Sequence, residues 1–63
     1  MSEYRNDLIY TVKRISKCWK DNNLYSSNKK AYDDMVSMIA DEYLKLGFSI
    51  DEIRKLVSEN MVY

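Results

Sequence analysis

The sequence predicts a small all-α domain of three helices, and three observations carry this prediction. The chain has 63 residues, with no proline and one glycine, so few positions interrupt a helix. Apolar residues recur at three- and four-residue steps along three segments. Between the second and third segments, a helix-ending signal is followed at once by a helix-starting signal. We expect helices over about 3–20, 29–46 and 50–60, in a single domain that spans residues 1–63.

The first predicted helix, 3–20, has an apolar side and a basic side, and Ser2 is its candidate N-cap. The apolar side carries Tyr4, Leu8, Ile9, Val12, Ile15 and Trp19. The opposite side carries Asn6, Tyr10, Lys13, Arg14, Lys17 and Lys20. The spacing therefore predicts a helix that is buried along one side and positively charged along the other.

The segment 21–28 is rich in Asn and Ser, which bond to their own backbone, and is expected to be a loop. Within it, Leu24 and Tyr25 are expected to pack onto the core. Three residues are candidate caps of the next helix, and the sequence leaves the choice open: Ser26, Ser27 and Asn28.

The second predicted helix, 29–46, has a broad apolar zone. Its central stripe consists of Tyr32, Met35, Val36, Ile39, Tyr43 and Leu46. Further apolar residues flank the stripe on both sides: Ala31, Met38, Ala40 and Leu44. A zone of this width predicts a helix that contacts more than one neighbour.

The corner between the second and third helices carries four local signals that agree. Gly47 adopts the left-handed backbone that ends a helix without steric cost. Ser49 and Glu52 have the spacing of a capping box, and Phe48 and Ile53 have the spacing of a hydrophobic staple. The sequence therefore predicts a tight turn between two helices at this point.

The third predicted helix, 50–60, buries one face and is followed by an apolar C-terminal segment. The buried face is expected to consist of Ile50, Ile53, Leu56, Val57 and Met61. The final residues Met61, Val62 and Tyr63 have two equally supported interpretations. They dock on the domain, or they contact a second chain.

The segment 43–56, about a quarter of the chain, resembles corners in known families. Its Leu46-Gly47-Phe48-Ser49-Ile50-Asp51-Glu52-Ile53 run looks like the corner of MerR-type transcription regulators. It is also similar to the corner in the hairpin with which SinI and SinR proteins pair, and to the turn of ubiquitin-associated domains. The resemblance implies a helical hairpin of a kind used in regulators; the chain is assigned to none of these families.

The residue inventory disfavours catalysis and cofactor binding. Without histidine, the chain has no Ser-His or Cys-His nucleophile pair, and it lacks a glycine-rich phosphate loop. Cys18 is the only cysteine, which excludes an intrachain disulfide and disfavours a zinc site. We expect Cys18 to be a half-buried apolar residue. The sequence predicts a protein that is not an enzyme and has no cofactor, no metal and no small-molecule substrate.

The charges are balanced overall but divided between the two halves of the chain. Residues 1–30 carry seven Lys and Arg against three Asp and Glu, whereas residues 31–63 carry three against seven. This division predicts attraction between the halves, within one chain or between antiparallel copies. No apolar run is long enough to span a membrane, and the single cysteine is typical of a reducing, cytoplasmic location.

Size and composition favour a protein that acts by binding another protein. A chain this short has a marginal core, and its Tyr and Met residues suit adaptable contacts. We expect a small regulator or inhibitor, as a homodimer, that binds partners through Tyr10, Met38, Met61 and Tyr63. The alternative is a nucleic-acid-binding protein that uses Lys13, Arg14, Lys17 and Lys20. The richness in Lys, Asn, Tyr and Ile is typical of small phage and mobile-element proteins of AT-rich bacteria.

Overall fold

The chain folds as three α-helices joined by two short connections. The computed structural model describes residues 4–63. Helix α1 spans Arg5–Asp21, α2 spans Asn28–Lys45 and α3 spans Ile50–Asn60. The predicted all-α class is confirmed, and five of the six helix ends lie within one residue of prediction. The exception is the start of α1, at Arg5 rather than about residue 3, where Tyr4 is the N-cap and makes no side-chain cap bond. The predicted start near residue 3 and the candidate cap Ser2 lie outside the described residues.

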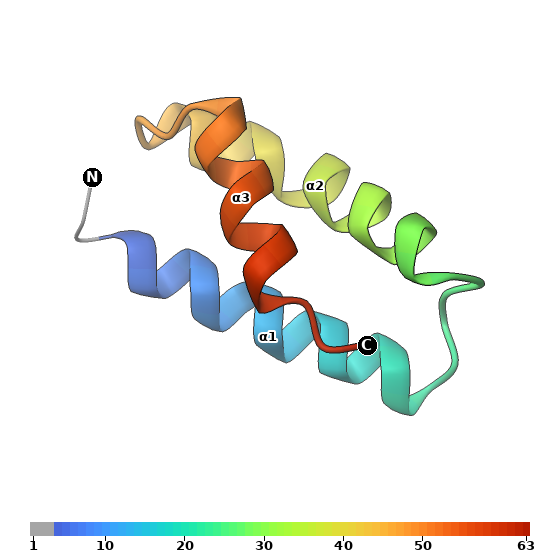
Figure 1. Ribbon diagram of the computed structural model, residues 1–63. Helices are drawn as coiled ribbons and strands as arrows, with labels where there is room; N and C mark the ends of the chain where they lie inside the picture. Colours follow the sequence, from blue (N-terminus) through green and yellow to red (C-terminus); the bar gives the residue numbers. More distant parts are fainter. Residues whose placement is uncertain (1–3) are drawn as a thin grey trace.

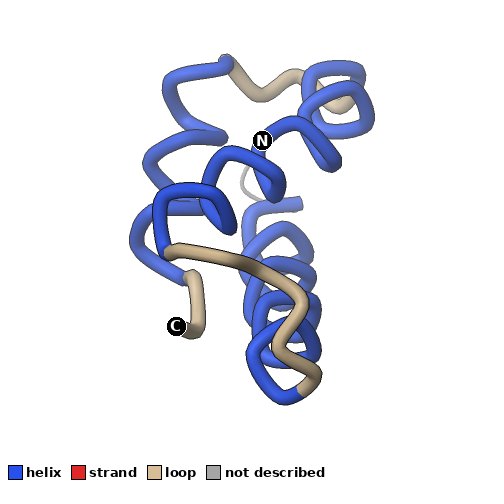
Figure 2. The backbone as a smooth tube through the Cα atoms, turned by 90° about the vertical axis from the view of Figure 1, so that its right-hand side faces the viewer, coloured by secondary structure: helices blue, strands red, loops and turns tan. Residues whose placement is uncertain are grey.

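Helix α3 packs across the other two helices. Figure 1 shows α1 and α2 as the two long sides of the molecule, with α3 passing from the end of α2 towards α1. Figure 2, turned by 90°, shows the loop that joins α1 to α2 at one end of the molecule. The Cα atoms extend over 32 × 17 × 17 Å, so the domain is elongated along its two longer helices.

The core lies where one side of each helix meets the others. Its buried residues are Leu8, Val12, Met35, Ile39, Tyr43, Phe48, Ile53, Leu56 and Val57. Partly buried side chains pack against this cluster, among them Trp19, Tyr32 and Met61. The predicted buried stripes of all three helices are therefore confirmed in their central residues, and burying them supplies the main favourable free energy of folding.

Helices α1 and α2 end in the same backbone arrangement. After α2, the Gly47 N–H donates to the Leu44 carbonyl and the Phe48 N–H to the Tyr43 carbonyl, each over 3.1 Å. Gly47 has a φ of 102°, in the region open to glycine. These two bonds form a Schellman motif, and its usual apolar contact is present as an edge-to-face pair of Tyr43 and Phe48 rings, 5.6 Å apart.

A second Schellman motif ends α1, where the sequence predicts only a loop. The Leu24 N–H donates to the Trp19 carbonyl over 2.9 Å, and the Asn23 N–H to the Lys20 carbonyl over 3.2 Å. Asn23 takes the left-handed position with a φ of 55°, which asparagine tolerates better than most residues. The connection is thus an ordered helix end rather than a free loop.

Serine side chains cap the N-termini of α2 and α3. Of the three candidates for α2, Ser27 is the cap, and its Oγ accepts from the Lys30 N–H over 3.1 Å. Ser49 Oγ likewise accepts from the Glu52 N–H over 3.1 Å. The predicted capping box is only half formed, because the hydrogen bonds among residues 4–63 include none from the Ser49 N–H to the Glu52 carboxylate.

Tyr43 joins α2 to α1 through its hydroxyl group. The hydroxyl donates to Asp7 Oδ2 over 2.7 Å, and Thr11 Oγ1 lies 3.4 Å from the same oxygen. Because the single phenolic proton goes to Asp7, the Thr11 hydroxyl is the donor in the second contact. Burial, followed by the neighbouring Asp7 carboxylate, raises the pKa of Tyr43, whereas the bond from Thr11 opposes this rise.

Substitutions at the left-handed positions of the two Schellman motifs are expected to change the free energy of unfolding differently. Gly47→Ala places a Cβ where φ is positive and is expected to lower the free energy of unfolding by about 1 kcal/mol. Asn23→Gly relieves the same strain after α1 and is expected to leave the stability unchanged or slightly raised. Urea unfolding followed by circular dichroism measures both; equal losses in the two variants would contradict this account.

Tyr43 predicts a loss of stability in alkaline solution. A pKa raised in the folded state makes a stabilising contribution that is full below the unfolded value of about 10 and is lost as pH rises through the higher folded value. Wild-type stability should therefore fall above about pH 10, and fall less steeply in Tyr43→Phe. At neutral pH that variant should be less stable by about 1 kcal/mol, through the lost bond to Asp7. Tyr10→Phe, on an exposed side chain, is the control and should leave both quantities unchanged.

Candidate interaction surface

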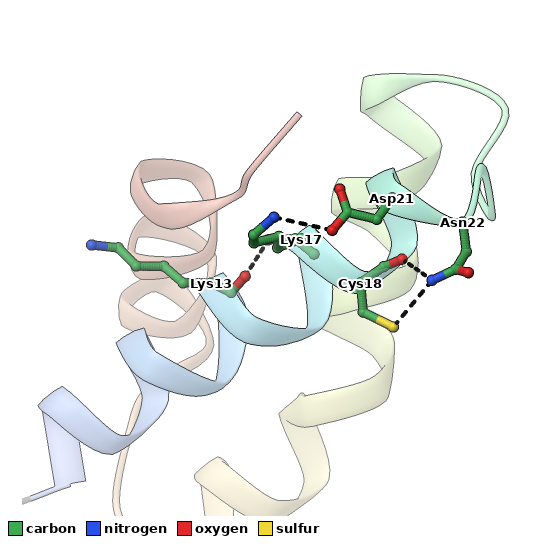
Figure 3. A network of polar contacts seen from close by, with 6 residues as sticks. Lys13, Lys17, Cys18, Asp21 and Asn22 are labelled. Carbon is green, nitrogen blue, oxygen red and sulfur yellow. Dashed lines mark hydrogen bonds and ion pairs between the residues drawn. The ribbon is translucent and has the colours of Figure 1, made fainter.

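The outer face of α1 presents an exposed tyrosine among basic side chains. Tyr10 has 65% of its surface exposed. One helical turn further along α1 lie Lys13 and Arg14, and both are exposed. Lys17 and Lys20 continue the basic side chains along the helix, and Figure 3 shows Lys13 extending away from α1. The four predicted basic residues are thus all on the surface of one helix.

The ion pairs of residues 4–63 are made within single helices. Lys17 Nζ lies 3.0 Å from Asp21 Oδ2 on α1. Figure 3 marks this pair with a dashed line. The other two pairs, Lys29 with Asp33 and Lys30 with Asp34, form the same four-residue step on α2. All three pairs are solvent-exposed and contribute little to stability. The charge division between the two halves of the chain therefore produces no ion pair between helices among the described residues.

Helix α2 presents an exposed methionine among acidic side chains. Met38 has 51% of its surface exposed. Its helical neighbours at four residues before, three after and four after are Asp34, Asp41 and Glu42, all exposed. Asp41 and Glu42 take part in none of the ion pairs among residues 4–63. The charges that follow Met38 along α2 are thus opposite in sign to those that follow Tyr10 along α1, whereas the residue three positions before Tyr10 is the exposed Asp7, which accepts the bond from Tyr43.

The C-terminal segment docks on its own domain. Met61 is half-buried against the core, and the Val62 N–H donates to Ser16 Oγ over 2.9 Å. Ser16 is fully buried, and its hydroxyl donates in turn to the Val12 carbonyl over 2.7 Å. Of the two interpretations of this segment, the structure shows the first, in which the segment folds back onto α1 (Figure 1).

Tyr63 lies at the end of this docked segment with part of its side chain exposed. Its exposed fraction is 40%. Burial raises the pKa of Tyr63, and the neighbouring hydroxyls of Tyr32 and Tyr25 raise it further. The predicted partner residues fall into two groups: Tyr10 and Met38 project from helix faces, whereas Met61 and Tyr63 belong to the docked C-terminal segment.

Three expectations about side-chain burial are wrong. Tyr4, placed on the buried side of the first predicted helix, is 38% exposed. Leu24 was expected to pack onto the core, but it is 65% exposed. Cys18, expected to be half-buried, is exposed on α1. Asn22 Nδ2 donates to the Cys18 carbonyl over 2.8 Å and approaches its Sγ at 3.6 Å (Figure 3).

Sequence reasoning missed the roles of Ser16 and Asp7. Ser16 falls on the apolar arc of α1, four residues after Val12 and three before Trp19. A hydroxyl at such a position needs a hydrogen-bond partner once it is buried. A serine on an apolar arc therefore indicates a hydrogen bond that holds another segment against the helix. Asp7 carries no comparable signal, because its partner Tyr43 is 36 residues away in the sequence.

Pockets and metal-ligand groups are absent from the described residues. No pocket is found in the structure, and residues 4–63 contain no group of three or more carboxylates or thiols placed to hold a metal ion. The helices among these residues are all too short or too polar to cross a bilayer.

Comparisons of the chain with protein-family models, with curated proteins and with solved structures give no match. The resemblance of segment 43–56 to regulator corners therefore has no support from these comparisons. The capping and Schellman bonds described above account for the same residues physically.

Ser16→Ala is expected to loosen the C-terminal segment. The Val62 N–H loses its acceptor, whereas the Val12 carbonyl keeps its place in the helical bonding of α1. Hydrogen exchange at the Val62 amide should become faster. Because Ala favours helix more than Ser, stability is compared with Ser37→Ala, an exposed site on α2 with the same gain in propensity. Relative to that control, we expect the free energy of unfolding to fall by about 1 kcal/mol. An unchanged exchange rate at the Val62 amide would contradict the role of Ser16 in holding the C-terminal segment.

Proposed function

We propose that this chain is a cytoplasmic, non-enzymatic regulator that acts by binding another protein and covering its working surface. The observation that supports the proposal most directly is the exposure of Tyr10 and Met38 on helix faces. Neither side chain is needed by the core, which is filled by other residues of the same helices. Tyr and Met are enriched at the centres of protein interfaces, where they supply large contact areas.

The surroundings of these two side chains also support protein binding. Each is surrounded by exposed charged groups one helical turn away, so each has an apolar centre and a polar rim. Interfaces between proteins are commonly built in this way, with the rim charges setting the partner and the rate of association. The domain beneath is a compact set of helices that holds both faces in place.

Nucleic-acid binding is the second candidate, favoured by the alignment of exposed cations on α1. Lys13, Arg14 and Lys20 are exposed and make no ion pair among residues 4–63. A row of this kind suits contacts with a phosphate backbone. Against it stand the balanced net charge of the chain and the position of the cations in the second half of the helix, away from the end that commonly reads bases.

Substitution of the exposed apolar side chains tests the proposed function. Tyr10→Ser and Met38→Ser should leave the fold intact, with changes in stability of about 0.5 kcal/mol or less. The wild-type chain and each variant are immobilised separately and incubated with nuclease-treated cell lysate. The amount of protein captured by each variant should be at least about tenfold lower than the amount captured by the wild type. Arg54→Ser, on the exposed side of α3, is the control and should capture as wild type does.

Two results would contradict the proposal. If the captured amount is the same with and without the Tyr10 and Met38 side chains, these two helix faces are not the binding surface. Retention on mixed-sequence DNA that falls about tenfold or more with a severalfold rise in salt, and that is lost in Lys13→Ser, would establish the nucleic-acid candidate instead.

A further inference from the structure

The exposed faces of α1 and α2 are complementary in charge. We define the basic face by Tyr10, Lys13 and Arg14, and the acidic face by Met38, Asp41 and Glu42. Each has one large apolar side chain with two like charges one helical turn further along the helix. The charges of the acidic face join none of the ion pairs among residues 4–63, and neither do those of the basic face.

The two faces also match in size. At a rise of about 1.5 Å per residue, each set of residues covers about 6 Å of helix axis. Neighbouring side chains extend both sets with the same sign, because Lys17 follows the basic face and Asp34 precedes the acidic one. Each of these two is already engaged in an exposed ion pair of its own helix, so it adds a weaker charge to the face.

We propose that the partner of this domain includes a second copy of the same chain, with the basic face of one copy bound to the acidic face of the other. This inference rests on the proposed function and names the partner for these faces. Tyr10 and Met38 meet at the centre of the contact, where a thioether beside an aromatic ring is favourable. Lys13 and Arg14 pair with Asp41 and Glu42 around it.

The contact joins unlike faces, so its geometry determines the assembly. Two copies close the contact twice around a two-fold axis, or further copies repeat it head to tail. In both arrangements the charges are unscreened only at low ionic strength, so association should weaken as salt rises. Within one chain the same charges have no ion-pair partner on another helix among residues 4–63, and the second copy supplies it.

Charge reversal tests the pairing directly. The first variant carries Lys13→Glu and Arg14→Glu, which makes both of its faces acidic. The second carries Asp41→Lys and Glu42→Lys, which makes both basic. Each variant alone should associate at least tenfold more weakly than wild type in sedimentation at low salt. An equimolar mixture should restore association, because the acidic faces of the first variant then meet the basic faces of the second.

A matched control separates this pairing from a general effect of charge. Arg54→Glu with Lys55→Glu makes the same change of charge on exposed residues of α3 and should leave association unchanged. Circular dichroism establishes that each variant is folded. Tyr10→Ser and Met38→Ser supply a second pair of variants without any change of charge, and each should weaken association at least tenfold.

A wild-type chain that stays monomeric at millimolar concentration and low salt would overturn the inference. So would variants that associate as wild type does, or a mixture that restores nothing. If the wild type is monomeric while capture from lysate still depends on Tyr10 and Met38, the second copy is excluded and the proposed function stands. If neither association nor capture depends on these residues, both proposals fail.

Discussion

The position of Tyr43 is the constraint on which the arrangement of the helices depends. Its carbonyl accepts the Phe48 N–H that closes the end of α2, and its ring packs edge-to-face on Phe48. Its hydroxyl donates to Asp7 on α1. One residue therefore fixes the end of α2, the direction in which the chain leaves towards α3, and the approach of α1. A small core has few such contacts, so each one carries a large share of the specificity of the fold.

The C-terminal segment is held on the other side of α1 by a hydrogen bond and an apolar contact. Ser16 accepts the Val62 N–H, and Met61 packs against the core. With Asp7 and Ser16 on different sides of α1, that helix is joined to α2 on one side and to the end of α3 on the other. The outer face of α1 makes neither of these contacts. The proposed function uses this outer face because the other faces of α1 pack against the rest of the domain.

The local features of the fold were predictable because their causes lie within a few residues. Gly47, Ser49 and the apolar spacing of each helix predict the all-α class and the corner between α2 and α3. Tyr10, Met38 and Tyr63, expected from the sequence to bind partners, are all exposed. The Schellman end of α1 was not predicted, because its left-handed residue is Asn23, one of several loop residues with similar preferences.

The features that join distant parts of the chain were not predictable in the same way. Tyr43 was placed in the core by its spacing, but its bond to Asp7 depends on how closely α1 approaches α2. The C-terminal segment had two interpretations, and only the packed structure places it on Ser16. The sequence by itself determined the three helices, their approximate extents and the central residues of their buried sides, since these follow from periodicity and local hydrogen bonding. Only the tertiary structure decided which polar groups anchor one helix to another and which faces stay open, because both depend on distances between residues far apart in the chain.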